Sequence, residues 1–305
     1  MQYFNIKNTD LSISSLALGT WVFGGDCWGG VKEQDCIDTV SAAIDLGINL
    51  IDTAPIYGYG ASESIVGKAI KGRRDKVVIA TKCGLIGIGA HIKHNLDPES
   101  IRTEIEESLK RLKIDFIDIY QCHWPDQNTP IEETLGFLCK LQQEGKIKYI
   151  GVSNFDDKLL QRACDFTKIV TLQNQYSLLE REIEDKVLPV CRDLNVGVLT
   201  YGPLTGGILS GKYKTEPNFK PGDSRSFFYK CYKGEEFNKT KKKIDELEKF
   251  KRPLNQLAVN WVRQQAGIAS VITGARNPEQ IIQNAKAFEW YLSDEELMEI
   301  SQVTK

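Results

Sequence analysis

Short apolar segments typical of β-strands alternate with longer segments of helical spacing along this chain, and the alternation repeats eight times. Strands that alternate with helices build parallel sheets, and eight such units close into a (β/α)8 TIM barrel. A chain of 305 residues has the right length for one barrel of this kind. We therefore predict an α/β protein with a single domain over residues 1–305. The predicted strands are residues 16–18, 50–52, 77–81, 117–121, 149–152, 171–173, 197–201 and 270–272.

Two of the predicted helices carry recognisable end signals. Residues 98–112 follow Asp97, a favourable N-cap, and begin with Pro98 at the first helical position. Their apolar residues recur with the 3.6-residue period of a helix. Residues 131–144 end before Gly145, where a left-handed cap is expected. Both segments are predicted as barrel helices.

Four segments do not belong to the eightfold repeat. Residues 3–13 alternate around a turn, which predicts an N-terminal β-hairpin that closes the bottom of the barrel. Residues 293–302 predict one extra C-terminal helix beyond the last unit. Residues 202–237 are too long for a simple connection, so they are predicted as a functional loop. Residues 84–95 contain glycines without the spacing of a dinucleotide fingerprint, and they are predicted as a mobile substrate loop.

Charge and cysteine usage limit the classes of function. The net charge of −2 predicts no basic surface for nucleic acid or a membrane. The eight cysteines show no Cys-x-x-Cys spacing, and no signal peptide or bilayer-spanning window is evident. His91 and His94 share one helical face but have no third ligand, so no metal site is predicted. These features predict a cytoplasmic protein without a nucleic-acid or membrane partner, and they leave the oligomeric state open.

Polar side chains suited to proton transfer follow three consecutive predicted strands. Asp52, Lys82 and His123 stand at or just beyond strand ends, and Tyr57 lies in the glycine-rich loop after Asp52. In a parallel barrel these ends lie on one face, where TIM-barrel enzymes carry out their chemistry. A single strand-end lysine is usually a surface residue, and a single aspartate there is often a turn cap. The combination on three successive strands favours a catalytic site.

Six short motifs follow one another along the chain. They are Gly19-Thr20-Trp21, Asp52-Thr53-Ala54 with Tyr57, Thr81-Lys82, His123-Trp124, Gly151-Val152-Ser153-Asn154-Phe155 and Tyr201-Gly202-Pro203-Leu204. With these motifs in this order, the chain resembles the aldo-keto reductases over essentially its whole length. The family has the (β/α)8 fold, in agreement with the strand count. The resemblance implies an oxidoreductase that reduces aldehydes or ketones to alcohols by hydride transfer.

The catalytic tetrad of the family corresponds to four residues of this chain, Asp52, Tyr57, Lys82 and His123. Hydride addition leaves negative charge on the carbonyl oxygen, which must receive a proton. Tyr57 is expected to give this proton, and Lys82 is expected to lower the tyrosine pKa from its ordinary value of roughly 10. Asp52 would orient Lys82, and His123 would hydrogen-bond to the carbonyl oxygen.

The hydride itself requires a cofactor, because no side chain can supply it. The resemblance implies a nicotinamide nucleotide. Ser153, Asn154 and Gln173 match the residues that bind its carboxamide, and Tyr201 matches the ring that stacks on the nicotinamide. The other expected cofactor contacts are Gly19, Thr20, Trp21, Asp52, Gly202, Pro203, Leu204, Gly207, Leu209, Lys212, Arg225, Gly274, Arg276, Gln280 and Asn284.

Arg276 suggests which nucleotide is preferred. It lies in the segment that opens the last barrel helix, where free amides favour phosphate. One arginine can bind a 2′-phosphate through two hydrogen bonds, so NADP(H) is favoured over NAD(H). The aldose-reductase branch carries a lysine and a second arginine at the positions of Gly274 and Gln280. The chain therefore looks closer to the bacterial and potassium-channel β-subunit branches.

The substrate is expected to meet an aromatic wall. Such walls suit carbonyl compounds with apolar parts. Two alternatives to a carbonyl reductase stay open. One is a nucleotide-sensing binding module with weak reductase activity, and the other is a sugar or polyol dehydrogenase that runs in the oxidative direction. The expected substrate contacts are Trp21, Tyr57, His123 and Trp124, with Cys27, Trp28 and Phe155 as further candidates.

Overall fold

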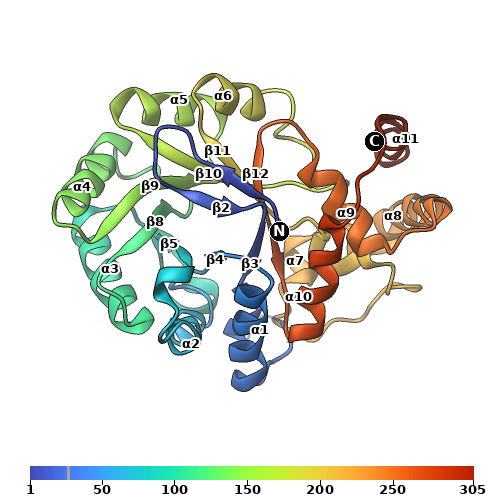
Figure 1. The fold of residues 1–305 in the computed structure, drawn as a ribbon, viewed down its shortest axis with the longest axis horizontal. Coiled ribbons are helices and arrows are strands. Elements are labelled where there is room, and N and C mark those ends of the chain that lie inside the picture. The colour runs from blue at the N-terminus through green and yellow to red at the C-terminus, as the bar shows by residue number, and fades with distance from the viewer. Residues whose placement is uncertain (26–27) are drawn as a thin grey trace.

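The computed structural model describes residues 1–25 and 28–305. Eight parallel strands form a closed barrel in the spatial order β3-β4-β5-β8-β9-β10-β11-β12 (Figure 1). All eight predicted strands are present, so the predicted TIM barrel is confirmed. The strands span Leu16–Gly19 (β3), Leu50–Asp52 (β4), Val78–Cys83 (β5), Ile117–Cys122 (β8), Ile147–Ser153 (β9), Ile169–Gln175 (β10), Gly197–Tyr201 (β11) and Ile268–Gly274 (β12).

Helices surround this barrel, as the view along its axis shows (Figure 1). The predicted helix 98–112 is present with the same bounds, and the carboxylate of Asp97 accepts hydrogen bonds from the amides of Glu99 and Ser100. Gly145 has the expected left-handed conformation after α4, with φ of +72°. The surrounding helices are Glu33–Asp45 (α1), Ala61–Ala69 (α2), Pro98–Leu112 (α3), Ile131–Gln143 (α4), Asp157–Phe166 (α5), Val187–Asp193 (α6), Leu254–Arg263 (α9) and Pro278–Ala285 (α10).

The bottom of the barrel is closed by the predicted N-terminal hairpin. Strands Tyr3–Asn5 (β1) and Ser12–Ser14 (β2) pair antiparallel across the barrel opening (Figure 1). Ile6, Leu11 and Ile13 pack inside the barrel against apolar residues of its strands. Burial of apolar side chains at about 25 cal/mol per Å² makes this plug stabilising. The carboxyl ends of the strands, with their polar side chains, lie at the opposite opening of the barrel.

The C-terminal part adds helices outside the ring. The predicted extra helix is present as Asp294–Thr304 (α11), and it begins with a capping box in which Ser293 and Glu296 exchange hydrogen bonds. It lies beside Gly234–Leu247 (α8) (Figure 1). Within residues 1–25 and 28–305, no helix has both the length and the apolar character needed to cross a membrane.

Two segments predicted as loops contain regular structure. Residues 202–237 include a 3-10 helix, Thr205–Ser210 (η4), a short α-helix, Arg225–Phe228 (α7), a second 3-10 helix, Lys230–Tyr232 (η5), and the first turn of α8. Residues 84–95 form an antiparallel hairpin of Leu85–Ile86 (β6) and Lys93–His94 (β7). These elements depend on contacts with the barrel rim, which local sequence signals do not reveal.

Candidate active site

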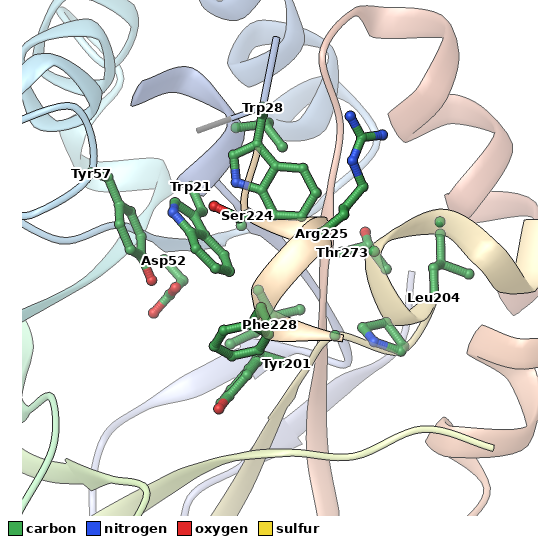
Figure 2. A pocket seen from close by; sticks show the side chains of 18 of the residues that line it. Trp21, Trp28, Asp52, Tyr57, Tyr201, Leu204, Ser224, Arg225, Phe228 and Thr273 are labelled. Carbon is green, nitrogen blue, oxygen red and sulfur yellow. The ribbon is translucent and has the colours of Figure 1, made fainter. Parts of the chain in front are cut away.

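A pocket of about 690 Å³ opens at the carboxyl ends of the barrel strands. Its walls come from the strand ends and from the long segment after β11, so residues from both halves of the chain meet there (Figure 2). Most of the expected site residues line this pocket. They are Gly19, Trp21, Asp52, Tyr57, His123, Trp124, Ser153, Asn154, Gln173, Tyr201, Gly202, Pro203, Leu204, Gly207, Lys212, Arg225, Gly274, Arg276, Gln280 and Asn284.

Three expected contacts do not reach the pocket. Thr20 is fully buried, and its hydroxyl donates to the carbonyl oxygen of Asp52 at 2.9 Å, so it supports the strand end from behind. Leu209 and Phe155 are buried in the apolar core between barrel and helices. These two side chains therefore contribute to packing of the fold and not to the pocket wall. Cys27 lies outside the described residues.

Lys82 forms the floor of the site beneath the pocket. Its ammonium group lies 2.9 Å from both carboxylate oxygens of Asp52 and 3.2 Å from the hydroxyl of Tyr57. A fourth oxygen, the carbonyl of Thr53, lies at 2.9 Å. The side chain of Lys82 is fully buried. The structure thus brings together Asp52, Tyr57 and Lys82, three of the four residues of the expected tetrad, in one hydrogen-bonded cluster.

Gln173 completes this cluster in a way that the sequence did not suggest. Its amide nitrogen donates to the carboxylate of Asp52 at 2.7 Å. Expected only as a carboxamide ligand, Gln173 also helps to hold Asp52 in place. No local signal connects these two residues, because they are 121 positions apart and meet only across the closed barrel.

The position of Tyr57 is fixed by a close backbone contact. A Cβ atom at Gly24 would lie 2.5 Å from the amide nitrogen of Gly58, and one at Gly58 would lie 2.6 Å from the Cα of Gly24. Only glycines, which have no Cβ atom, allow two segments of the backbone to approach this closely. The 3-10 helix Trp21–Gly24 (η1) therefore rests directly on the loop that carries Tyr57.

The pKa of Tyr57 is shifted in the direction opposite to the one expected. Burial raises the pKa of Tyr57 well above its ordinary value of 10, and the negative charge of Asp52 adds to this shift. The ammonium of Lys82 was expected to lower it, but Asp52 binds Lys82 through both oxygens and offsets its charge. Tyr57 is consequently a neutral phenol at physiological pH, which still has the proton that an acid must give.

His123 is also neutral. Burial lowers the pKa of His123 well below its ordinary value of 6.5, and the positive charge of Lys82 lowers it further. Its ring lies edge-on to Tyr57, with the ring centroids 5.9 Å apart. The carbonyl oxygen of His123 accepts from the amide of Asn154 at 2.8 Å, which fixes the backbone beside the ring. A neutral imidazole there can donate one hydrogen bond to an oxygen near Tyr57.

The expected carboxamide ligands form a network of their own. Asn154 has a left-handed backbone, with φ of +59°, and its side-chain oxygen accepts from the hydroxyl of Tyr201 at 2.8 Å. The hydroxyl of Ser153 donates to the carbonyl oxygen of Gln173 at 2.8 Å. These bonds connect Ser153 and Asn154, at the end of β9, to the neighbouring strands β10 and β11. All four residues keep a surface on the pocket.

Three cationic side chains line the other end of the pocket. Arg225 binds the carboxylate of Asp223 through two nitrogens and stacks on Trp28, with its guanidinium 5.6 Å from the ring centroid (Figure 2). Arg276 donates to the carbonyl oxygen of Trp28, and burial lowers its pKa from the ordinary value. Lys212 lies against Gly207, which has the left-handed φ of +97°. This end is suited to an anionic group.

The end of the pocket near Tyr57 and His123 is apolar. Trp21 stacks on Tyr57 with ring centroids 5.9 Å apart and meets Phe228 edge-on at 5.5 Å (Figure 2). Several of its lining residues were not predicted, because they belong to the two segments that were treated as loops. These residues are Leu85, Ile92, Phe227, Phe228 and Tyr229, together with Tyr59 from the loop of Tyr57.

The chain is similar to known proteins over almost its full length. The model of the Aldo/keto reductase family matches residues 15–305. Over 309 residues the chain is 40% identical to "Aldo-keto reductase YhdN" of Bacillus subtilis (strain 168), and the match covers 99% of this chain and 93% of that protein. Over 317 residues it is 39% identical to "NADH-specific methylglyoxal reductase" of Escherichia coli (strain K12), with coverage of 96% and 95%.

Solved structures give the same result. The structure of the glycerol dehydrogenase AKR11B4 from Gluconobacter oxydans has a TM-score of 0.90 and 39% sequence identity, and the match covers 99% of this chain and 94% of that one. The holo form of the aldo-keto reductase AKR11C1 from Bacillus halodurans has a TM-score of 0.85 at 28% identity, with coverage of 100% and 97%.

Proposed function

Because the chain belongs to the aldo/keto reductase family, and is therefore an oxidoreductase that reduces carbonyl groups, we propose that Tyr57 is the acid that completes this reduction. The observation that carries the proposal is the cluster at the pocket floor, where Lys82 contacts both Tyr57 and Asp52. Burial keeps Tyr57 protonated, and Lys82 is placed to stabilise the phenolate that forms when the proton leaves.

The other residues support this proton transfer. Asp52 keeps the buried ammonium of Lys82 charged and oriented, and Gln173 holds Asp52. Neutral His123 donates a hydrogen bond to the carbonyl oxygen and places it within reach of the hydroxyl of Tyr57. The apolar wall with Trp21 and Trp124 excludes water from this oxygen. A nicotinamide nucleotide, the cofactor of the family, supplies the hydride when it is bound.

Tyr57→Phe tests this role. Removal of the phenolic proton donor is expected to lower kcat by about 10²- to 10⁴-fold, the usual contribution of a general acid. The nucleotide dissociation constant should stay within about twofold of the wild type, because the aromatic ring is kept. Steady-state rates with an aldehyde, combined with fluorescence titration of the nucleotide, measure both quantities. Wild-type-like rates in Tyr57→Phe would contradict the assignment.

We further propose that NADP(H) is preferred over NAD(H), with Arg276 as the ligand of the 2′-phosphate. Arg276 lines the cationic end of the pocket next to the start of α10. The Escherichia coli relative is named as NADH-specific, so the preference requires a direct test. Ser153, Asn154 and Tyr201 would hold the nicotinamide end, and Lys212 and Arg225 the pyrophosphate.

Arg276→Ala separates the two nucleotides. Loss of charge-assisted hydrogen bonds worth about 1.5–3 kcal/mol is expected to weaken NADPH binding by about 10- to 150-fold and to leave NADH binding nearly unchanged. Arg162→Ala is the matched control, because Arg162 pairs with Glu132 on the helical surface. Calorimetric titration measures all dissociation constants. Equal losses of affinity for NADPH and NADH would show that Arg276 does not bind the 2′-phosphate.

The oxidative direction is a second candidate, because one solved relative is named a glycerol dehydrogenase. In that direction the proton of the alcohol would go to the phenolate form of Tyr57, which Lys82 is placed to stabilise, so this activity is expected to rise with pH. Reduction of NADP⁺ in the presence of glycerol measures this activity.

Placement near the bacterial and channel β-subunit branches, and a cytoplasmic location, stay predictions from the sequence.

A further inference from the structure

The hairpin of β6 and β7 stands at the apolar end of the pocket. Leu85 from β6 and Ile92, which precedes β7, line this end together with Trp124. The hairpin begins at Gly84 and closes where the amide of Asn95 donates to the Gly84 carbonyl oxygen at 3.0 Å. Its inner side therefore contributes directly to the wall that surrounds a substrate near Tyr57.

Hydrogen bonds tie this hairpin to both neighbouring loops. The amide of Gly89 donates to the hydroxyl of Tyr59 at 2.9 Å, in the loop that carries Tyr57. On the other side, Nδ1 of His94 lies 2.9 Å from the carbonyl oxygen of Pro125. Because a carbonyl oxygen only accepts, Nδ1 carries the proton in this bond. The hairpin thus bridges the loops that follow β4 and β8.

His94 contacts the substrate wall only from behind. Its imidazole packs beside the indole of Trp124, with ring centroids 5.9 Å apart and planes inclined at 31°. Trp124 lines the pocket, whereas His94 is exposed and does not. The bond to Pro125 anchors the residue directly after Trp124. Both contacts support the indole from the side that faces away from the pocket.

We propose that His94 is a positioning residue that holds Trp124 in the pocket wall and thereby sets a preference for bulky aromatic aldehydes over small aliphatic ones. The inference rests on the proposed function, because it requires the substrate to lie against Trp124. The expected preference follows from the contact area that each substrate can form with the indole. A flat, fixed indole gives a large contact area to an aromatic substrate, whereas a small aliphatic aldehyde has little apolar surface to place against it.

His94→Ala tests the proposal with two substrates, benzaldehyde and propanal. The kcat/KM for benzaldehyde is expected to fall about tenfold, mainly through KM, because loss of one wall contact in an apolar pocket costs that much. The value for propanal and the dissociation constant of NADPH should change less than about twofold. Equal losses for both aldehydes, or no loss for benzaldehyde, would overturn the proposal.

Two further variants keep the test sharp. His94→Asn retains an N–H donor near the position of Nδ1 and is expected to recover part of the lost benzaldehyde activity, whereas a variant no better than His94→Ala would overturn the role of the Pro125 bond. In a Trp124→Ala background, His94→Ala should have no additional effect on selectivity, and independent losses would contradict action through Trp124. A wild-type protein that reduces neither aldehyde would overturn the proposed function along with this inference.

Discussion

Lys82 is a buried cation whose charge is stabilised by four oxygen atoms. Burial lowers the pKa of Lys82 from its ordinary value, and the carboxylate of Asp52 opposes this shift. Removal of one partner from a buried ion pair leaves an uncompensated charge, whereas removal of both leaves none. At the scale of single residues, stability and catalysis therefore place different demands on the same pair.

Variants of Asp52 and Lys82 separate the contribution of this pair to stability from its contribution to catalysis. Asp52→Asn is expected to lower the free energy of unfolding by about 3 kcal/mol, because the ammonium loses its counter-charge. The double variant Asp52→Asn with Lys82→Met should recover much of this loss and stay inactive, because nothing then stabilises the phenolate of Tyr57. Urea denaturation and steady-state kinetics measure the two effects. A double variant less stable than Asp52→Asn would contradict the reasoning.

At the scale of secondary-structure elements, Glu104 connects helix α3 to the hairpin of β6 and β7. Both of its carboxylate oxygens lie 3.1 Å from the amide of Gly84. Burial raises the pKa of Glu104 to about 8, and the hydrogen bond from the backbone amide of Gly84 lowers it only in part. Glu104 therefore keeps its proton in the folded state over a pH range where the unfolded chain has lost it.

This difference gives a signed pH dependence. Between pH 4.5 and 8 the folded state binds more protons at Glu104 than the unfolded state does, so its contribution to stability falls as pH rises. Relative to Glu104→Gln, the wild type should lose up to about 1.4 kcal/mol of unfolding free energy per pH unit in this range. Denaturant titrations at pH 5, 6.5 and 8 measure the difference. A constant difference across these pH values would show that Glu104 titrates normally.

Elements with local signals were predictable from the sequence. Helix α3 has its N-cap, its first proline and its apolar period within residues 97–112, and its bounds agree with the prediction. The hairpin of β6 and β7 has no such signals, because it depends on Tyr59 and Pro125 in loops that are distant in the sequence. The helix α7 inside the long segment after β11 was missed for the same reason.

At the scale of the whole molecule, the pocket unites the beginning, middle and end of the chain. Trp28 follows the first barrel strand and Arg276 follows the last, and they share a hydrogen bond. A ligand between such segments stabilises the native state as a whole, because the unfolded chain has no pocket. NADPH at 100 times its dissociation constant is expected to add about 2.7 kcal/mol to the free energy of unfolding.

Thermal unfolding monitors this linkage. The added stability should raise the Tm by about 5 °C for a chain of this size. Arg276→Ala at the same NADPH concentration should show a clearly smaller rise, because its occupancy is lower. An unchanged Tm with NADPH, despite binding seen by titration, would mean that the unfolded chain binds the nucleotide as tightly as the native state does, which would contradict binding in a pocket that only the fold creates.

The convergence of the strand ends was predictable because barrel closure follows from the strand count. Asp52, Lys82 and His123 meet for that reason. The electrostatics were not predictable, since the raised pKa of Tyr57 depends on its burial and on how completely Asp52 offsets Lys82. The pairing of Arg225 with Asp223 likewise depends on the fold of the long segment.

The Asp52–Lys82–Tyr57 cluster and His123 have a consequence for how such a protein changes over evolutionary time. All four residues come from one continuous stretch, residues 52–123, whereas the three cationic side chains at the other end of the pocket, Lys212, Arg225 and Arg276, come from a later stretch. If the proposed roles hold, mutations in the later stretch are expected to alter the nucleotide that binds without changing the groups proposed to move the proton. In such a fold, natural selection can change the preferred nucleotide and the groups for proton transfer separately, because they are encoded in different parts of one gene.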